Sequence, residues 1–126
     1  MVEISDEEYE AVTERGREVF ATEPHAKSAR YDPHSGLVTL ELYNGCIFSV
    51  PARQLQGLER ATDAELSEIE VLGLGYGVHW ETLDADFTVR GLMAGRFGNA
   101  AFMVRHHTRM RALLSELEGV PRNAAA

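Results

Sequence analysis

The most constraining feature of this sequence is the dipeptide Asn44-Gly45, which lies between two runs of strand-forming residues, 37–43 and 46–50. Asn-Gly is the strongest short signal for a two-residue type I′ turn, because both positions tolerate a positive φ. The sequence therefore predicts an antiparallel hairpin in which Tyr43 lies opposite Cys46.

This pairing determines which side chains share a face of the hairpin, because alternate residues of a strand point to opposite sides. The face predicted to pack on the core carries Val38, Leu40, Leu42, Ile47 and Ser49. The opposite face carries Thr39, Glu41, Tyr43, Phe48 and Val50. If no helix covers this second face, Glu41, Tyr43 and Phe48 form a candidate contact surface for a partner.

Three further stretches have strand character. Residues 26–31 lead into the turn-forming run 32–36 and are expected to precede the hairpin directly. Residues 69–72 and 78–80 flank the glycine-rich segment 73–77, which predicts a second hairpin. The expected result is an antiparallel, hairpin-rich sheet of about five strands.

Helical patterns flank and connect these strands. An N-terminal helix opens at the capping box Ser5–Glu8, carries apolar residues at helical spacing as far as Phe20 and is stopped by Pro24. Short connector helices are expected near residues 54–58, at the second capping box Thr62–Glu65 and over residues 89–94. The fold class is therefore α+β. The segment Leu83-Asp84-Ala85-Asp86-Phe87 is interpreted as a loop or extended link.

The last predicted helix is amphipathic, begins at the cap Asn99 and ends at about residue 118. Its expected stripe consists of Met103, His107, Met110, Leu114 and Leu117. Such a stripe usually packs on a core, but a terminal helix can also pair with its twin, so a homodimer contact stays open. The whole chain, 1–126, is expected to be a single domain with a tail at 119–126.

Charge and hydropathy restrict the partners. The 20 acidic and 12 basic side chains give a net charge of −8, which disfavours phosphate backbones and favours a basic protein partner. No apolar run approaches the roughly 20 residues of a membrane span, and residues 1–10 are acidic where a leader would be basic and apolar. With one cysteine, Cys46, no internal disulfide can form. We expect a cytoplasmic protein without a membrane contact.

No catalytic or cofactor motif is present. The glycine-rich segment 73–77 lacks the dinucleotide-binding spacing and the phosphate-loop lysine, and it leads into a strand-like segment, so it is interpreted as a hairpin loop. No serine lies in a nucleophile elbow, and Cys46 has no obvious activating base. We therefore assign no catalytic residue and no cofactor, and a binding function is favoured over an enzymatic one.

A metal site is one alternative. Asp84 and Asp86 are two positions apart, so in an extended segment they point the same way and could bind a divalent cation, with His79 and Glu81 near them in sequence. Paired aspartates more often cap turns, and the five histidines lack zinc-site spacing. No metal ligand is assigned, and His79, Asp84 and Asp86 are added to the candidate interaction surface.

Nucleic-acid binding is a second alternative, because basic residues concentrate in the last helix. Arg105, Arg109 and Arg111 could contact phosphates despite the acidic total. A lone helix is not a helix-turn-helix, however, and Glu116 and Glu118 follow in the same helix.

Seven short segments carry a resemblance: Ile4-Ser5-Asp6-Glu7-Glu8, Arg15-Gly16, Ala29-Arg30-Tyr31-Asp32, Gln56-Gly57-Leu58, Ile69-Glu70-Val71, His79-Trp80 and Leu83-Asp84-Ala85-Asp86. In this order and spacing they resemble the bacterial domain-of-unknown-function family 2442, from about Ile4 to Phe102. The resemblance implies a small α+β domain with a hairpin-rich sheet and without an established activity, cofactor or catalytic residue. Some relatives look like components of toxin-antitoxin-like gene pairs, and some carry a DNA-binding helix-turn-helix or basic tail where this chain has one amphipathic helix.

The leading hypothesis is a non-catalytic protein-interaction module, as an antitoxin-like component of a small bacterial two-gene system. The alternatives are a DNA-binding transcriptional regulator that uses the C-terminal helix, and a small metal-dependent enzyme or metal-binding protein.

Overall fold

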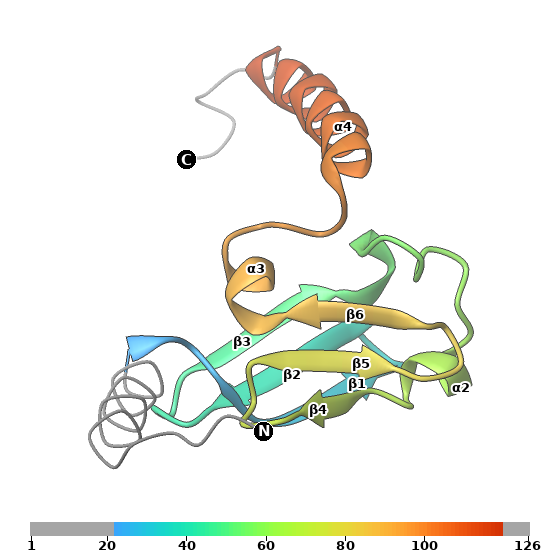
Figure 1. Ribbon diagram of the computed structural model, residues 1–126. Helices are drawn as coiled ribbons and strands as arrows, with labels where there is room; N and C mark the ends of the chain where they lie inside the picture. The colour runs from blue at the N-terminus through green and yellow to red at the C-terminus, as the bar shows by residue number, and fades with distance from the viewer. Residues whose placement is uncertain (1–21, 120–126) are drawn as a thin grey trace, which may run out of the picture.

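This computed structural model describes residues 22–119 and has an α+β architecture with two three-stranded antiparallel sheets (Figure 1). The first sheet has the order β1-β2-β3, with bounds Ala26–Asp32, Leu37–Leu42 and Ile47–Pro51. The second has the order β4-β5-β6, with bounds Glu70–Leu72, Gly77–Trp80 and Ala85–Thr88. Residues 1–21, where most of the predicted N-terminal helix falls, lie outside the described residues.

The two sheets enclose one apolar core. Alternation along β2 buries Val38, Leu40 and Leu42, and alternation along β5 buries Val78 and Trp80. The Trp80 side chain is fully buried, and its indole N–H donates a hydrogen bond of 3.0 Å to the Leu66 carbonyl. Because a buried indole N–H without an acceptor is costly, this bond orients Trp80 in the core.

A backbone contact joins the two sheets at their edges, where β1 lies beside β4. The Ala26 N–H donates a hydrogen bond of 2.6 Å to the Gly75 carbonyl. Gly75 has a φ of +93°, and a Cβ at this position would meet the backbone of Ala26. The glycine-rich segment is therefore a hairpin loop between β4 and β5, as predicted, and one of its glycines permits the junction of the sheets.

We predict that Gly75→Ala destabilises the protein more than Gly73→Ala. Both residues have a positive φ, but a Cβ at Gly73 would meet nothing within 4 Å. The Gly73 change should cost about 1–2 kcal/mol through the backbone alone. The Gly75 change adds a clash with backbone atoms and the loss of the Ala26 hydrogen bond, for a total on the order of 3 kcal/mol. Urea unfolding of both variants measures the difference, and equal losses would contradict the role assigned to this junction.

The register of the β2–β3 hairpin corrects the prediction. The connection is a three-residue loop, because the Leu42 N–H bonds to the Cys46 carbonyl at 2.8 Å and the Gly45 N–H bonds to the Leu42 carbonyl at 3.0 Å. Gly45 has a φ of +89°, as the left-handed position of such a loop requires. The predicted two-residue turn is wrong, and the pairing shifts by one residue.

This shift moves every side chain of β3 to the other face. Phe48 now pairs with Leu40 and Val50 with Val38, so both lie on the core side. Ile47, expected in the core, is 67% exposed, and Ser49 is exposed beside Thr39. Phe48 therefore does not share a face with Glu41 and Tyr43.

The strand count also differs from the prediction. Residues 83–87 were expected to form a loop or link, but β6 begins at Ala85 and pairs with β5, so the described chain has six strands in two sheets and not about five in one. Asp84 adopts a φ of +47°, and its N–H donates to the Glu81 carbonyl at 3.2 Å. Asp84 therefore lies in a turn, as predicted. The turn ends before Ala85, so Asp86 lies in β6.

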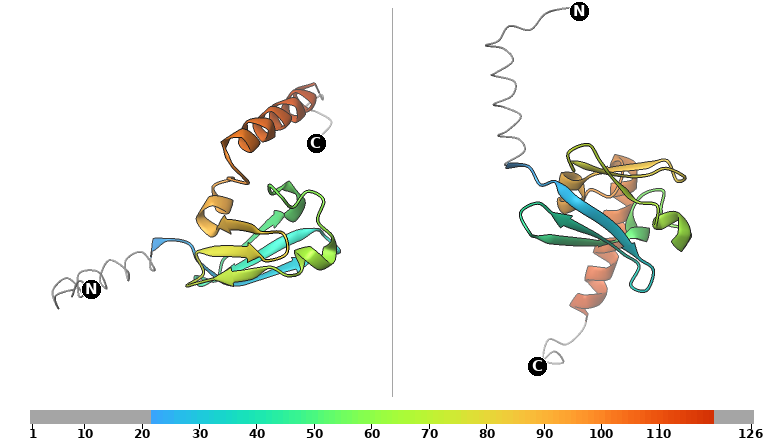
Figure 2. Two further views of the ribbon diagram at one scale, coloured as in Figure 1. Left: turned by 45° about the vertical axis from the view of Figure 1, so that its right-hand side comes forward. Right: turned by 90° about the horizontal axis from the view of Figure 1, so that it is seen from below.

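The helical elements are η1 (Ala52–Gln54), α2 (Asp63–Leu66), α3 (Val89–Met93) and α4 (Ala100–Glu118). The capping box of Thr62 and Glu65 is confirmed at the start of α2. The short helix predicted near residues 54–58 is wrong, because the 3₁₀ helix η1 ends at Gln54 and Leu55 is extended. α4 projects away from both sheets (Figure 2). Within residues 22–119, no helix combines the length and apolarity needed to cross a membrane.

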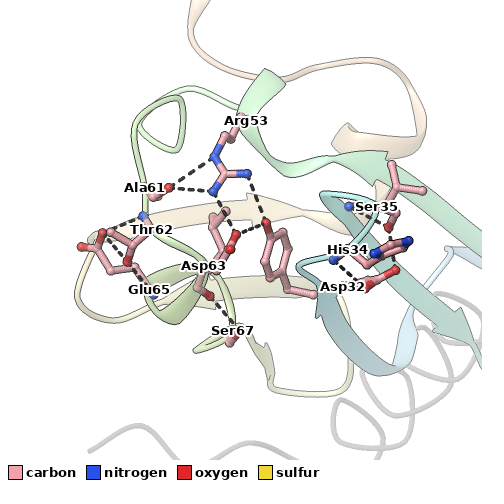
Figure 3. Close-up of polar contacts among 12 residues, drawn as sticks. Asp32, His34, Ser35, Arg53, Ala61, Thr62, Asp63, Glu65 and Ser67 are labelled. Carbon is pink, nitrogen blue, oxygen red and sulfur yellow. Dashed lines mark hydrogen bonds and ion pairs between the residues drawn. The ribbon is translucent and has the colours of Figure 1, made fainter.

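A polar network attaches these connectors to the first sheet (Figure 3). The Tyr31 hydroxyl donates to the Asp63 carboxylate at 2.7 Å, and Arg53 donates to the same carboxylate at 3.1 Å and to the Ala61 carbonyl at 3.0 Å. The hydrogen bonds from Tyr31 and then Arg53 hold the pKa of Asp63 below its ordinary value. The network therefore fixes η1 and α2 against the end of β1.

Candidate functional site

A histidine–carboxylate cluster lies on the outer face of the second sheet. Val78 and Trp80 point into the core, so His79 between them points outward, as predicted. The strand register places Glu70 of β4 and Asp86 of β6 directly opposite His79 on its two sides. Residues in register share a face, and Glu81 follows two residues after His79. The cluster, consisting of Glu70, His79, Glu81 and Asp86, thus spans all three strands.

Its geometry favours a protonated histidine. His79 Nδ1 lies 2.5 Å from Asp86 Oδ1, and Nε2 lies 2.7 Å from Glu81 Oε2, so the imidazolium can donate from both nitrogens. The hydrogen bonds to Glu81, and then to Asp86, raise the pKa of His79 above its ordinary value of 6.5. The His79 side chain is 15% exposed, whereas those of Glu81 and Asp86 are 84% and 66% exposed. The cluster is therefore an ion-pair network at the surface.

The same cluster offers a set of metal-ligand atoms. One ligand atom from each of Glu70, His79 and Glu81 lies within 4.8 Å of the others, which is close enough for a divalent cation. This set differs from the predicted combination of His79, Asp84 and Asp86. Both nitrogens of His79 already have carboxylate partners, so the ion pairs alone account for this arrangement.

We predict that Glu81→Gln lowers the pKa of His79, because it removes the largest cause of the increase. A pKa raised by folding contributes stability that is fully present below about pH 6.5 and is lost as the pH rises through the folded value. The wild type should therefore lose its advantage over Glu81→Gln as the pH increases from about 6 to 9. NMR titration of His79 and melting temperatures across this range measure both effects. Glu118→Gln, on α4, is the control, and an unchanged His79 pKa in Glu81→Gln would refute this electrostatic assignment.

The residues predicted as one interaction surface do not form a continuous patch. Glu41 is half-buried on the outer face of the first sheet, while His79 and Asp86 lie on the outer face of the second, on the other side of the shared core. Tyr43 is 56% exposed in the hairpin loop, and its ring lies 5.0 Å from that of His25. Phe48 packs against the core. The structure thus brings together His79 and Asp86 but separates them from the hairpin residues.

Asp84 and Asp86 share a groove of about 730 Å³. The groove follows β6 and continues to the segment before α4. Its charged lining consists of Asp84, Asp86, Arg90 and Arg96. These charges are balanced, which gives no preference for an anionic or a cationic ligand.

The segment before α4 is held by hydrogen bonds to Gln56, which lies in the connector after η1. The Gln56 N–H donates to the Phe97 carbonyl at 2.8 Å, and its side-chain oxygen accepts from the Asn99 N–H at 2.8 Å. Asn99 caps the helix as predicted, because its side chain accepts from the Phe102 N–H at 2.9 Å. Phe102 is buried in turn. The start of α4 is therefore hydrogen-bonded to the connector that follows η1.

The remainder of α4 is exposed, which the sequence pattern did not indicate. Every described residue from His107 to Gly119 is exposed. The apolar side chains on this part of the helix include Met110, Leu113, Leu114 and Leu117, which are 38%, 46%, 55% and 67% exposed. The interpretation that the stripe packs on the core is wrong beyond the first turns of α4. The interpretation that it contacts another molecule remains a prediction.

The three arginines of α4 are exposed, and none forms an ion pair with another described residue. At about 100° per residue, Arg105 and Arg109 share a face, whereas Arg111 diverges from Arg109 by about 160°. Glu116, seven residues after Arg109, lies on the face of Arg105 and Arg109. The helix therefore does not present three arginines to one phosphate backbone.

Comparison with known proteins gives a family but no activity. The profile of a family described as "protein of unknown function (DUF2442)" matches residues 26–98, a narrower range than the predicted 4–102. A crystal structure of a protein of unknown function from Rhodospirillum rubrum is similar with 55% identity and a TM-score of 0.63, over 65% of this chain and 99% of that chain. The solution structure of an uncharacterized protein from Chromobacterium violaceum has 32% identity and a TM-score of 0.63, over 83% of this chain and 96% of the other. Among curated proteins, none is significantly similar.

Proposed function

Because this chain belongs to the DUF2442 family of proteins of unknown function, we propose its function from its own geometry: a protein-interaction module that binds through α4. The observation that carries the proposal is the exposed apolar stripe of α4. We define this stripe by Met110, Leu113, Leu114 and Leu117, which lie on one side of the helix.

Most of α4 does not pack against other described residues. The exposed part of α4, residues 107–118, falls within the length of about 12–15 residues below which helices are marginal in water without tertiary packing. α4 has 19 residues, but its buried residue is Phe102 near the start, and the turns beyond His107 have no cover among the described residues. Contiguous exposed apolar side chains of this kind are typical of interaction sites. A partner that covers the stripe would supply the missing packing.

We predict that Leu114→Glu removes a stoichiometric protein partner in affinity purification of the tagged chain from its native host. The matched control is Leu74→Glu, because Leu74 is 65% exposed in the β4–β5 loop, away from the stripe. The control should retain the partner, since a charge at an exposed site that contacts nothing changes little. If wild type, Leu114→Glu and Leu74→Glu recover the same proteins, the stripe is not the binding surface.

The antitoxin-like role is one form of this proposal. The net charge of −8 favours a basic partner over an acidic one. In that form, a small basic protein would elute with this chain at a fixed ratio.

The alternative of a DNA-binding regulator has less support. The exposure of Arg105, Arg109 and Arg111 favours it, but Arg111 diverges from the other two and Glu116 lies on their face. We therefore expect that the wild-type chain leaves a DNA duplex unshifted in gel electrophoresis even at low salt, where phosphate contacts are strongest. A shift that weakens steeply with salt and disappears in Arg105→Ala/Arg109→Ala would establish nucleic-acid binding instead.

A further inference from the structure

We propose that the occupant of the α4 stripe is α4 of a second copy of this chain, packed antiparallel to the first. This inference rests on the proposed function, since it names the partner that covers the same surface. It is carried by three features of α4: the spacing of its apolar residues, the order of its charges along the helix, and its projection away from the sheets.

The spacing matches that of a paired helix. Met110 and Leu117 are seven residues apart, and Leu113 lies between them at intervals of three and four. His106, four residues before Met110, continues the series as a half-buried imidazole whose ring lies 5.4 Å from that of Phe97. This is the a/d pattern of two helices that pack side by side. Leu114 lies at the edge of the same seam and widens it. From Met110 to Leu117, the seam runs along the exposed part of α4.

The charges along α4 oppose the dipole of the helix itself. Arg105 and Arg109 lie in its first half and Glu116 and Glu118 in its last turn, whereas the helix dipole favours acidic residues at the start and basic residues at the end. Arg105 and Arg109 are also four residues apart, where like charges repel. The order of charges therefore destabilises an isolated α4.

An antiparallel second copy gives Arg109 and Glu116 partners of opposite charge. When the two seams are centred between residues 111 and 112, Arg109 of each copy lies about two residues along the axis from Glu116 of the other, on the same side of the seam, which is within reach of both side chains. The two-fold symmetry produces this pair twice. A parallel arrangement would place the basic halves side by side and the acidic halves side by side. The charges consequently select the antiparallel arrangement.

The position of α4 leaves room for this arrangement. The helix extends beyond the sheets, and its free part points away from them (Figures 1 and 2). In an antiparallel pair the two sheet regions lie at opposite ends of the paired helices, while in a parallel pair they lie at the same end.

The decisive experiment uses two full-length charge variants, Arg109→Glu and Glu116→Arg, in sedimentation equilibrium at low salt. The wild type should form a dimer. Each variant alone should dimerise more weakly, with a dissociation constant raised roughly tenfold, because two attractive pairs become repulsive. Mixing the two variants should restore a dimer of wild-type affinity, since both pairs are then attractive again, and the double variant Arg109→Glu/Glu116→Arg should do the same. Native mass spectrometry identifies the mixed species.

Leu113→Glu tests the seam independently of the charges and should abolish the dimer, while the control Leu74→Glu should leave it unchanged. Circular dichroism and Trp80 fluorescence report whether each variant stays folded. A wild-type monomer at all concentrations would overturn the self-association. If the wild type is a monomer but retains a stoichiometric protein partner in affinity purification that Leu114→Glu loses, the proposed function stands with another occupant. If the monomeric wild type retains no protein, both proposals fail. A dimer that is indifferent to the charge changes would overturn the antiparallel arrangement.

Discussion

The packing of two small sheets around Trp80 is the interaction on which the rest of the structure depends. A sheet of three short strands has too little apolar area to be stable alone, so each sheet needs the other to cover its inner face. Trp80 fills the space between them with its indole N–H bonded to the Leu66 carbonyl, and the Ala26–Gly75 backbone bond joins the sheets at their edges. Every outward-facing residue, His79 included, takes its direction from this arrangement.

The amino-acid sequence predicts much of this fold because turn and cap chemistry is local. The second hairpin, the capping box of Thr62 and the Asn99 cap all depend on residues a few positions apart. The errors arise where two local solutions have similar energies. Asn44-Gly45 fits both a two-residue turn and a three-residue loop with a left-handed glycine, and the choice between them exchanges Ile47 for Phe48 in the core. The buried area of Phe48 and Val50 settles that choice, and burial is a property of the whole fold.

The candidate sites were less predictable for the same reason. The outward direction of His79 follows from alternation, and Asp86 was near it in the prediction, but Glu70 is nine residues away and becomes a neighbour through the β4–β5 register. The sequence pattern of α4 indicated an apolar stripe without indicating what covers it. The periodicity is the same for an amphipathic helix that packs on the core and for one that projects from it. Only the position of the helix relative to the sheets distinguishes the two cases. Charge order carries additional information, and in α4 it runs against the helix dipole.

Hydrogen bonds hold the start of α4, whereas its residues from His107 onward are exposed. Gln56 bonds to both sides of the segment that leads into the helix, and Phe102 is buried immediately after the cap. In the proposed contact, these bonds would lower the conformational entropy that is lost when α4 packs against a partner. Family resemblance alone would describe the sheets and stop near residue 98, where the matched region ends. α4 lies outside the matched region, so the contact proposed for it rests on the exposure and charges of this chain and not on its family.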